Sequence, residues 1–366
     1  MRRSLYGGRF FVLKHRLIYA IKKYLMHFYS VSDFYKKIFG CKAYKIAIDA
    51  GCTCPTRDGT KGVGGCTFCS ATGSGDFASS RRLPISAQIE QAKRLVGKKS
   101  SGGTYIAYFQ NFTNTYGDAD ELEKKYLEAC SAPNVSGISI ATRPDCLSDD
   151  ILSRIARIAE GRAGDASSTA AENKAENTTD PTSSAERKFV QLELGLQTSD
   201  ENTAAAFRRG FTNNVYVDAV HRIRAASSRI HVVTHVILGL PGETEDTMLS
   251  TAQFCARAGT DGIKLSLLHV LRGTEMAADY GRGLFSCMEK DEYFSVLSAV
   301  LESLPPDMVI HRLTGDGAKR LLIAPMWTAD KKRVWNDMMR WFDDHDMQQG
   351  RVYKLSSGEK IPLKNK

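Results

Sequence analysis

The feature that most constrains the fold is a regular alternation of short apolar segments and longer helical ones between residues 44 and 268. Strands that alternate with helices in this way form a parallel sheet with helical crossovers. Six strand–helix units are too few to close a barrel of eight units. The six predicted strands span residues 44–49, 105–110, 138–142, 189–194, 230–238 and 262–268. The predicted helices between and after them span residues 85–96, 120–130, 148–160, 202–209, 214–226 and 245–258.

Both ends of the chain and one internal stretch depart from this alternation. Residues 8–38 are predicted to be helical, because apolar residues recur there mostly at steps of three and four. Residues 161–187 contain no Val, Ile, Leu, Met or aromatic residue, which predicts a disordered insertion. Residues 288–345 are predicted to be mostly helical with one strand at 308–313. The expected organisation is a basic helical segment (1–43), an α/β domain (44–285), a separate C-terminal cap (286–349) and a loose tail (350–366).

Positive charge is concentrated at the N-terminus. The chain of 366 residues has 50 Lys and Arg against 41 Asp and Glu, and residues 1–46 hold eleven of the basic residues but one acid. A local basic segment predicts an anionic partner, and an RNA such as tRNA is one candidate beside an acidic protein or a small phosphorylated substrate. No apolar run of about eighteen residues occurs, so no membrane span is predicted. The scattered cysteines are typical of a reducing compartment, and we expect a cytoplasmic protein.

Four of the nine cysteines lie in one short stretch, residues 49–70. Cys66 and Cys69 form a C-x-x-C pair, while Cys52 and Cys54 are separated by a single residue. Four glycines lie between Cys54 and Cys66, so this segment is expected to be a loop that can wrap closely around a bound group.

Three interpretations of these cysteines follow from their spacing. A structural disulfide is disfavoured in a long chain with no secretory signal. A zinc site with four thiolates is possible, although C-x-C is shorter than the usual zinc-binding hook. The third interpretation is an iron–sulfur cluster held by Cys54, Cys66 and Cys69, in which one iron would lack a protein ligand and could bind a cofactor or substrate.

The stretch 49–69, DAGCTCPTRDGTKGVGGCTFC, resembles the cluster loop of the YhcC-type radical S-adenosylmethionine (SAM) proteins. These belong to the Elongator/MiaB/NifB-like group. The sequence departs from the usual family pattern at Cys52, Thr56 and Ser266. The resemblance covers roughly residues 30–340 and continues, in the family's order, through YFQNFTNTY (108–116), ELGLQT (193–198), HVILGLPGET (235–244), LHVLRGT (268–274) and HRLTGD (311–316).

The resemblance implies a fold, a chemistry and partners. The fold it implies is α/β, a partial (β/α)6 TIM-type barrel with a small, mostly helical C-terminal cap. Cys54, Cys66 and Cys69 would hold a [4Fe–4S] cluster that cleaves SAM to a 5′-deoxyadenosyl radical, with a flavodoxin or ferredoxin as reductant. Relatives in the group often modify tRNA, which implies the side chain of a wobble uridine as substrate. A small-molecule or protein substrate, and a zinc-bound RNA-binding module without redox chemistry, are the alternatives.

Several polar residues follow the predicted strands, at the sheet edge where functional groups of parallel α/β folds collect. Glu193 lies between two leucines and needs a partner, either an arginine or a ligand hydroxyl. Arg143 could pair with a nearby aspartate instead of facing a ligand. His235 and His269 are candidate catalytic residues, although satisfied core histidines are commoner. The residues expected to bind SAM, partly from the resemblance, are Phe68, Gln110, Asn111, Glu193, Gln197 and Gly239.

Overall fold

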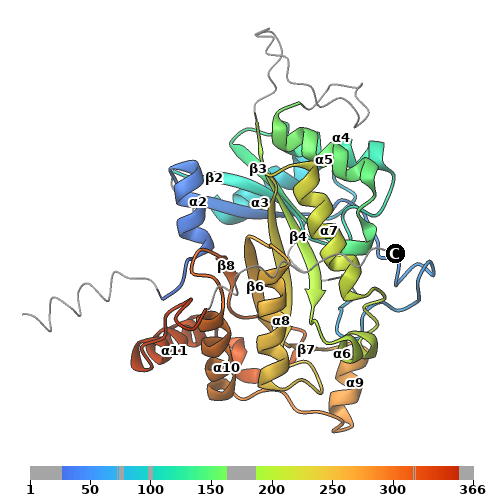
Figure 1. Ribbon diagram of the computed structural model, residues 1–366. Coiled ribbons are helices and arrows are strands. Elements are labelled where there is room, and N and C mark those ends of the chain that lie inside the picture. Colours follow the sequence, from blue (N-terminus) through green and yellow to red (C-terminus); the bar gives the residue numbers. More distant parts are fainter. Residues whose placement is uncertain are drawn as a thin grey trace, which may run out of the picture.

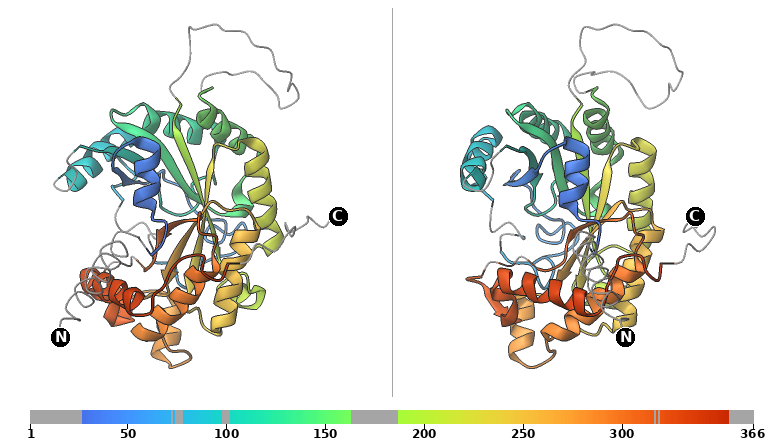
Figure 2. Two further views of the ribbon diagram at one scale, coloured as in Figure 1. Left: turned by 60° about the vertical axis from the view of Figure 1, so that its left-hand side comes forward. Right: turned by 90° about the vertical axis from the view of Figure 1, so that its left-hand side faces the viewer.

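The computed structural model describes residues 27–71, 73, 78–97, 102–162, 187–315, 317 and 319–353. Within them a single curled sheet of seven parallel strands has the order β1-β2-β3-β4-β5-β6-β8. The sheet is open, so the molecule is a partial barrel with helices along its outer side (Figures 1 and 2). The strands are β1 (Ala43–Ile48), β2 (Thr104–Phe109), β3 (Val135–Thr142), β4 (Phe189–Gln197), β5 (His231–Leu238), β6 (Gly262–Leu267) and β8 (Val309–Arg312).

The helices agree with the predicted alternation to within a few residues. A short antiparallel pair, β7 (Val270–Leu271) and β9 (Leu322–Ala324), lies outside the main sheet. The α-helices are α2 (Val31–Phe39), α3 (Ile85–Gly97), α4 (Ala119–Ser131), α5 (Asp149–Glu160), α6 (Glu201–Ala206), α7 (Asn213–Ala226), α8 (Glu245–Arg257), α9 (Glu275–Gly281), α10 (Lys290–Ser303) and α11 (Lys331–Asp344). Two short 3₁₀ turns, Pro144–Cys146 and Met326–Ala329, complete the described elements.

Local sequence explains where these helices begin and end, and α5 is an example. The side chain of Ser148 accepts a hydrogen bond from the backbone N–H of Ile151, which caps the N-terminus. Asp149 and Asp150 place negative charge in the first turn, where the helix dipole is positive. Gly161 ends the helix in a left-handed conformation with φ 74°.

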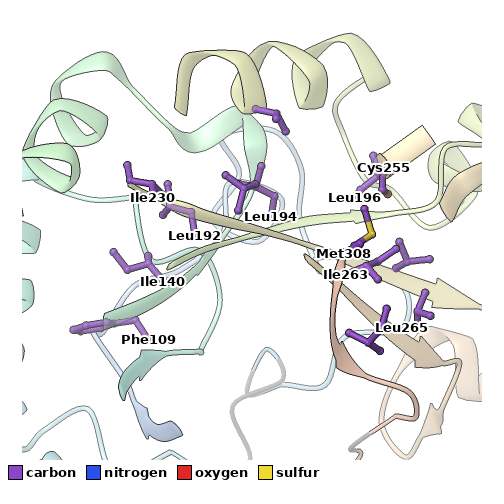
Figure 3. Close-up of a cluster of buried hydrophobic side chains, with 14 of the residues drawn as sticks. Phe109, Ile140, Leu192, Leu194, Leu196, Ile230, Cys255, Ile263, Leu265 and Met308 are labelled. Atoms are coloured by element: carbon purple, nitrogen blue, oxygen red, sulfur yellow. The ribbon is translucent and has the colours of Figure 1, made fainter. Parts of the chain in front are cut away.

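The main hydrophobic core lies between the sheet and its outer helices. Along β4, Leu192, Leu194 and Leu196 are fully buried in this core. Figure 3 shows Leu192 and Leu194 near Ile230, and Leu196 near Cys255 and Met308. Side chains alternate between the two faces of a strand, so the residues between these leucines face the inside of the barrel. The inner face is therefore free to carry polar residues.

The partial barrel with a mostly helical C-terminal region is confirmed, and its sheet has seven strands where six were expected. The strand predicted at 308–313 is β8, and it pairs in parallel with β6 as the seventh strand of the main sheet. The C-terminal part is otherwise mostly helical, as expected, through α10 and α11. Side chains of α10 and α11 also belong to the same core cluster as the sheet, so no break in packing occurs near residue 286.

Residues from both ends of the described chain are attached to β8. The backbone N–H of Ile310 donates to the carbonyl of Tyr29 at 2.8 Å. The side-chain amide of Gln349 donates to the carbonyl of Met308 at 2.8 Å, and its oxygen accepts from the backbone N–H of Tyr29 at 2.9 Å. The last strand of the sheet is thus fixed by segments more than 300 residues apart in the sequence.

Some predictions concern residues that the structure does not describe. The predicted helix over 8–38 is represented by α2, and its first part, residues 8–26, lies outside the described residues. Most of the predicted insertion (163–186) and of the tail (354–366) also lies outside them. Among the described helices, none combines the length and apolar character that crossing a bilayer requires.

Candidate functional site

A cavity of about 270 Å³ lies inside the partial barrel, at the ends of its strands. Cys54, Cys66 and Cys69 all line it, and we call them the cavity cysteines. The loop that carries them follows β1 and folds back on itself through a bridge between Asp58 and Val63. Three distant positions in the loop are in this way brought to one cavity.

Glycine is required within this loop where the backbone passes close to an arginine. Gly65 has φ +80°, and a Cβ there would lie 2.7 Å from Nε of Arg57. Arg57 in turn donates a hydrogen bond of 2.7 Å to the carbonyl of Ser70, just after the last cavity cysteine. The close approach at Gly65 thus lets one guanidinium hold the two ends of the loop together.

The surroundings of one cavity cysteine, Cys66, favour a thiolate. The neighbouring Cys69 thiol lowers the pKa of Cys66 to about 7, and the guanidinium groups of Arg143 and Arg57 act in the same direction. The Sγ of Cys54 lies 3.0 Å from the hydroxyl of Thr113. Burial raises the pKa of Cys54, and the hydrogen bond with Cys66 raises that of Cys69. Thiolates are the ligands of iron–sulfur clusters, so the donor set of three cysteines fits such a group.

Cys52 does not join the cavity cysteines. Its side chain is buried in the main hydrophobic core, and burial raises the pKa of its thiol to about 11. Within the described ranges, no three His, Cys, Asp or Glu side chains lie close enough together to hold a single metal ion. The arrangement therefore does not fit a four-thiolate zinc site that includes Cys52, whereas the three cavity cysteines all face one cavity with room for a bound group. All nine cysteines are free, so no disulfide forms in this loop.

Most of the residues expected to bind SAM or to act in catalysis come together in the same cavity. Two do not. Asn111 is buried and its side-chain amide donates to Asp49 at 2.6 Å, and Gly239 lies outside the lining with Met288 close to it. The expected residues that do line the cavity are Phe68, Gln110, Glu193, Gln197, His235 and His269.

Below the cysteines, each of the seven strands contributes a polar side chain to the inside of the barrel. We call this set the lumen layer. It surrounds Glu193, whose carboxylate is fully buried. The lumen layer comprises Lys45 (β1), Tyr108 (β2), Ser139 (β3), Gln191 and Glu193 (β4), His235 (β5), Lys264 (β6) and Arg312 (β8).

Glu193 accepts hydrogen bonds from six of these side chains, so its partners differ from the single arginine or ligand hydroxyl expected from the sequence. Burial alone would raise the pKa of Glu193, but the ammonium groups of Lys264 and Lys45 hold it well below its usual range. Glu193 is therefore ionised. The donors are Lys45, Tyr108 (3.0 Å), Ser139 (2.7 Å), Gln191 (2.7 Å), His235 (2.6 Å) and Lys264 (3.0 Å).

Sequence reasoning did not anticipate Lys264, although a lysine between Ile263 and Leu265 in a buried strand was a usable signal. Its Nζ lies 3.0 Å from the Tyr108 hydroxyl. Burial, with repulsion from Arg312 and Lys45, lowers the pKa of Lys264 to about 7 despite the opposing effect of Glu193. Lys264 is thus a buried amine that titrates near neutrality.

The positions of Arg143 and His235 each agree with one of the interpretations that the sequence offered. Arg143 lines the cavity and forms a bidentate pair with Asp145, with both N–O distances 2.9 Å. Burial lowers the pKa of His235 to about 4, and Lys264 adds to that effect. His235 is therefore neutral near pH 7.

Comparison with solved structures identifies the fold. An archaeal Elp3 of Methanocaldococcus infernus is similar with a TM-score of 0.56 at 15% sequence identity, over 84% of this chain and 64% of that chain. The present chain thus spans about two thirds of that longer protein. A tRNA-2-methylthio-N(6)-dimethylallyladenosine synthase of Chloroflexus aurantiacus is 34% identical over 87 residues, which is 24% of this chain and 19% of that protein.

Longer matches identify the family. Residues 183–255 match the Radical SAM superfamily, and residues 260–342 match the Radical SAM C-terminal domain. The protein YtqA of Bacillus subtilis is 39% identical over 316 residues, or 86% of this chain and 89% of YtqA. YhcC of Escherichia coli K12 is 30% identical over 85% of this chain and 90% of YhcC. The chain therefore belongs to the radical SAM enzymes, in the family of YtqA and YhcC.

Proposed function

We propose that the protein binds a [4Fe–4S] cluster through the cavity cysteines, binds SAM in the cavity beside them, and modifies tRNA at a wobble uridine side chain. The observation that carries the proposal is the meeting of Cys54, Cys66 and Cys69 in one cavity beside arginines, while Cys52 is held in the core. When bound, such a cluster supplies the electron that splits SAM into methionine and a 5′-deoxyadenosyl radical. Family membership argues against the alternative of a zinc-bound module without redox chemistry.

The chain's own residues would bind the cofactor and exclude water. Phe68 packs edge to face against Phe207, with ring centroids 5.2 Å apart, and presents an apolar wall beside the cysteines. Gln110 and Gln197 offer amide groups to a polar ligand from the ends of β2 and β4. Ile237 and Leu268 line the wall formed by β5 and the segment after β6. A largely apolar wall keeps water away from a reactive radical.

The neutral imidazole of His235 can accept a proton at Nδ1, because its one N–H proton lies on Nε2, which donates to the Glu193 carboxylate 2.6 Å away. We propose His235 as a candidate to take a proton from substrate, and His269 of the segment after β6 as a second candidate for proton transfer. An electron donor such as flavodoxin or ferredoxin would reduce the cluster.

The tRNA substrate rests on two independent supports. One is the match of 87 residues to a tRNA-modifying synthase. The other is the excess of basic residues in 1–46, since neutralising phosphates is the main source of affinity for nucleic acids. A small-molecule or protein substrate is the alternative.

Nucleoside mass spectrometry of tRNA tests the substrate. A strain without this protein should accumulate a wobble uridine with an incomplete side chain, and the intact gene should restore the modification. A Cys66→Ala gene serves as the matched control and should fail to restore it, because it lacks one cavity cysteine. An unchanged nucleoside profile in the deletion strain would exclude tRNA as substrate.

A further inference from the structure

The charges around the cavity are strongly unbalanced. Among the described residues that line it, four arginines and Lys264 face one acidic side chain, Glu193. Two of the arginines already have carboxylate partners, since Arg143 pairs with Asp145 and Arg209 pairs with Glu201. The one acidic side chain among the described lining residues, Glu193, belongs to the lumen layer.

In the lumen layer, two ammonium groups share one carboxylate. Lys45 and Lys264 both donate to Glu193, and both lie over the ring of Tyr108, at 4.8 and 5.0 Å from its centroid. Arg312 of β8 adds a guanidinium to the same wall of the cavity. A buried cation is costly unless an anion compensates it, and Glu193 supplies one negative charge for both lysines.

The lumen layer also lies deeper inside the barrel than the cavity cysteines do. Lys264 lies three residues before the end of β6, and strands rise about 3.3 Å per residue, so it is about 10 Å below the rim of the sheet. The cavity cysteines belong to the loop at that rim. Cations near the rim are placed to act on a bound cluster, whereas Lys264 faces the inner end of the same cavity.

We propose that the lumen layer receives an oxyanion of the substrate, a carboxylate or a phosphate, through the Nζ of Lys264. Lys264 fits this role because two of its three possible hydrogen bonds go to Tyr108 and Glu193, while its side chain lines the cavity. The anionic end of the substrate would be held at the inner end of the cavity, leaving its reacting part toward the cysteines. The proposal rests on the proposed function, since it assumes that SAM chemistry takes place above this layer.

Binding of small oxyanions to the full-length protein, reconstituted with its cluster and saturated with SAM, tests the proposal. Sodium phosphate and sodium acetate are titrated at constant ionic strength, and binding is measured from the rise in melting temperature with anion concentration. Both should bind the wild-type protein in preference to chloride. Tighter binding of acetate would identify a carboxylate subsite, and tighter binding of phosphate a phosphate subsite.

Removing the receiving ammonium should weaken anion binding. Lys264→Met should weaken binding at least ten-fold, because it removes the Nζ that would hold the oxyanion. Lys290→Met is the matched control and should leave binding unchanged, since Lys290 pairs with Asp337 on α11, outside the cavity.

The outcomes are distinct. Equal anion affinity in wild type and Lys264→Met would overturn the proposal. A parallel loss of SAM affinity in Lys264→Met would overturn it as well, because the lysine would then serve the carboxylate of SAM. Reductive SAM cleavage is measured on the same samples. Its absence from the wild type would refute the proposed function, whereas cleavage without anion binding would refute this inference alone.

Discussion

Replacing Glu193 with Gln should destabilise the fold more than any surface carboxylate substitution. The carboxylate accepts from six side chains and neutralises two lysines that are otherwise unpaired with acids in the described lumen layer. A glutamine retains one acceptor oxygen but turns an NH₂ group toward donors on the other side. The lysines would lose the carboxylate that favours their charged form, so each buried amine would either release its proton or stay an uncompensated cation.

The expected loss of unfolding free energy follows from the burial of Glu193 and Lys264. Glu193 has no exposed side-chain surface and Lys264 has 9%, so solvent screens their interaction weakly. Removing one partner of such a pair costs about 3–5 kcal/mol of unfolding free energy. The double variant Glu193→Gln/Lys264→Met should lose less than the sum of the single variants, by about 1–3 kcal/mol, because the second change removes a stranded charge.

Urea unfolding of the anaerobic, cluster-loaded protein measures these differences. Glu90→Gln is the control, since Glu90 is an exposed partner of Lys93 and its loss should cost below about 1 kcal/mol. If Glu193→Gln loses no more unfolding free energy than this control, the argument that Glu193 compensates buried charge is refuted. Additive single and double variants would show that Lys264 is compensated by another group.

Further outcomes are expected for the cysteines and for two titrating groups. Replacing any one cavity cysteine with Ala should abolish the iron content and brown colour of the reconstituted protein, while Cys52→Ser should keep both because Cys52 lies in the core; iron loss in Cys52→Ser equal to that of the cavity variants would contradict the ligand set. Burial raises the pKa of Glu243 to about 7, although a hydrogen bond with Thr198 acts in the opposite direction. The folded state therefore keeps a proton that the unfolded state releases, and unfolding free energy should fall by up to about 3 kcal/mol from pH 4.5 to above pH 7. In Glu243→Gln, the unfolding free energy measured with urea should be nearly the same at pH 5.5 and pH 8.5. If the variant keeps the pH dependence of the wild type, Glu243 is not its source. Because the pKa of Lys264 is lowered to about 7, acetate binding should weaken as pH rises from 6 to 8.5, and pH-independent binding would contradict a receiving ammonium.

The sequence was sufficient for most of the fold because the alternation of strands and helices is a local pattern. The seventh strand was recognised as a strand but placed in a separate cap. Its partner β6 lies more than 40 residues earlier, beyond α9 and α10, and no local pattern records such a pairing. Its attachment to Tyr29 and Gln349 is likewise a long-range contact.

The rim of the candidate site was easier to predict than its interior. Polar residues that follow strands, such as Gln110 and Gln197, were expected to converge and do so. The partners of Glu193 come from inner-face positions of five other strands and of β4 itself, and no pattern within a single strand records that these side chains meet. Asn111 shows the reverse error, because a polar residue after a strand can satisfy a neighbouring loop carboxylate instead of a ligand.

The attachment of β8 as the last strand also has a consequence for the order of events during synthesis. Cys69 precedes Arg312 by 243 positions, and at 5–20 residues per second the ribosome needs roughly 12–50 s to span them. During that interval the cysteine loop is complete while the wall formed by β8 does not yet exist. We expect an iron–sulfur carrier to reach the cysteines most easily in this window. Ribosome-bound chains stalled near residue 300 should then accept a cluster faster than the released apoprotein, and equal rates would show that the finished cavity is no barrier to cluster delivery.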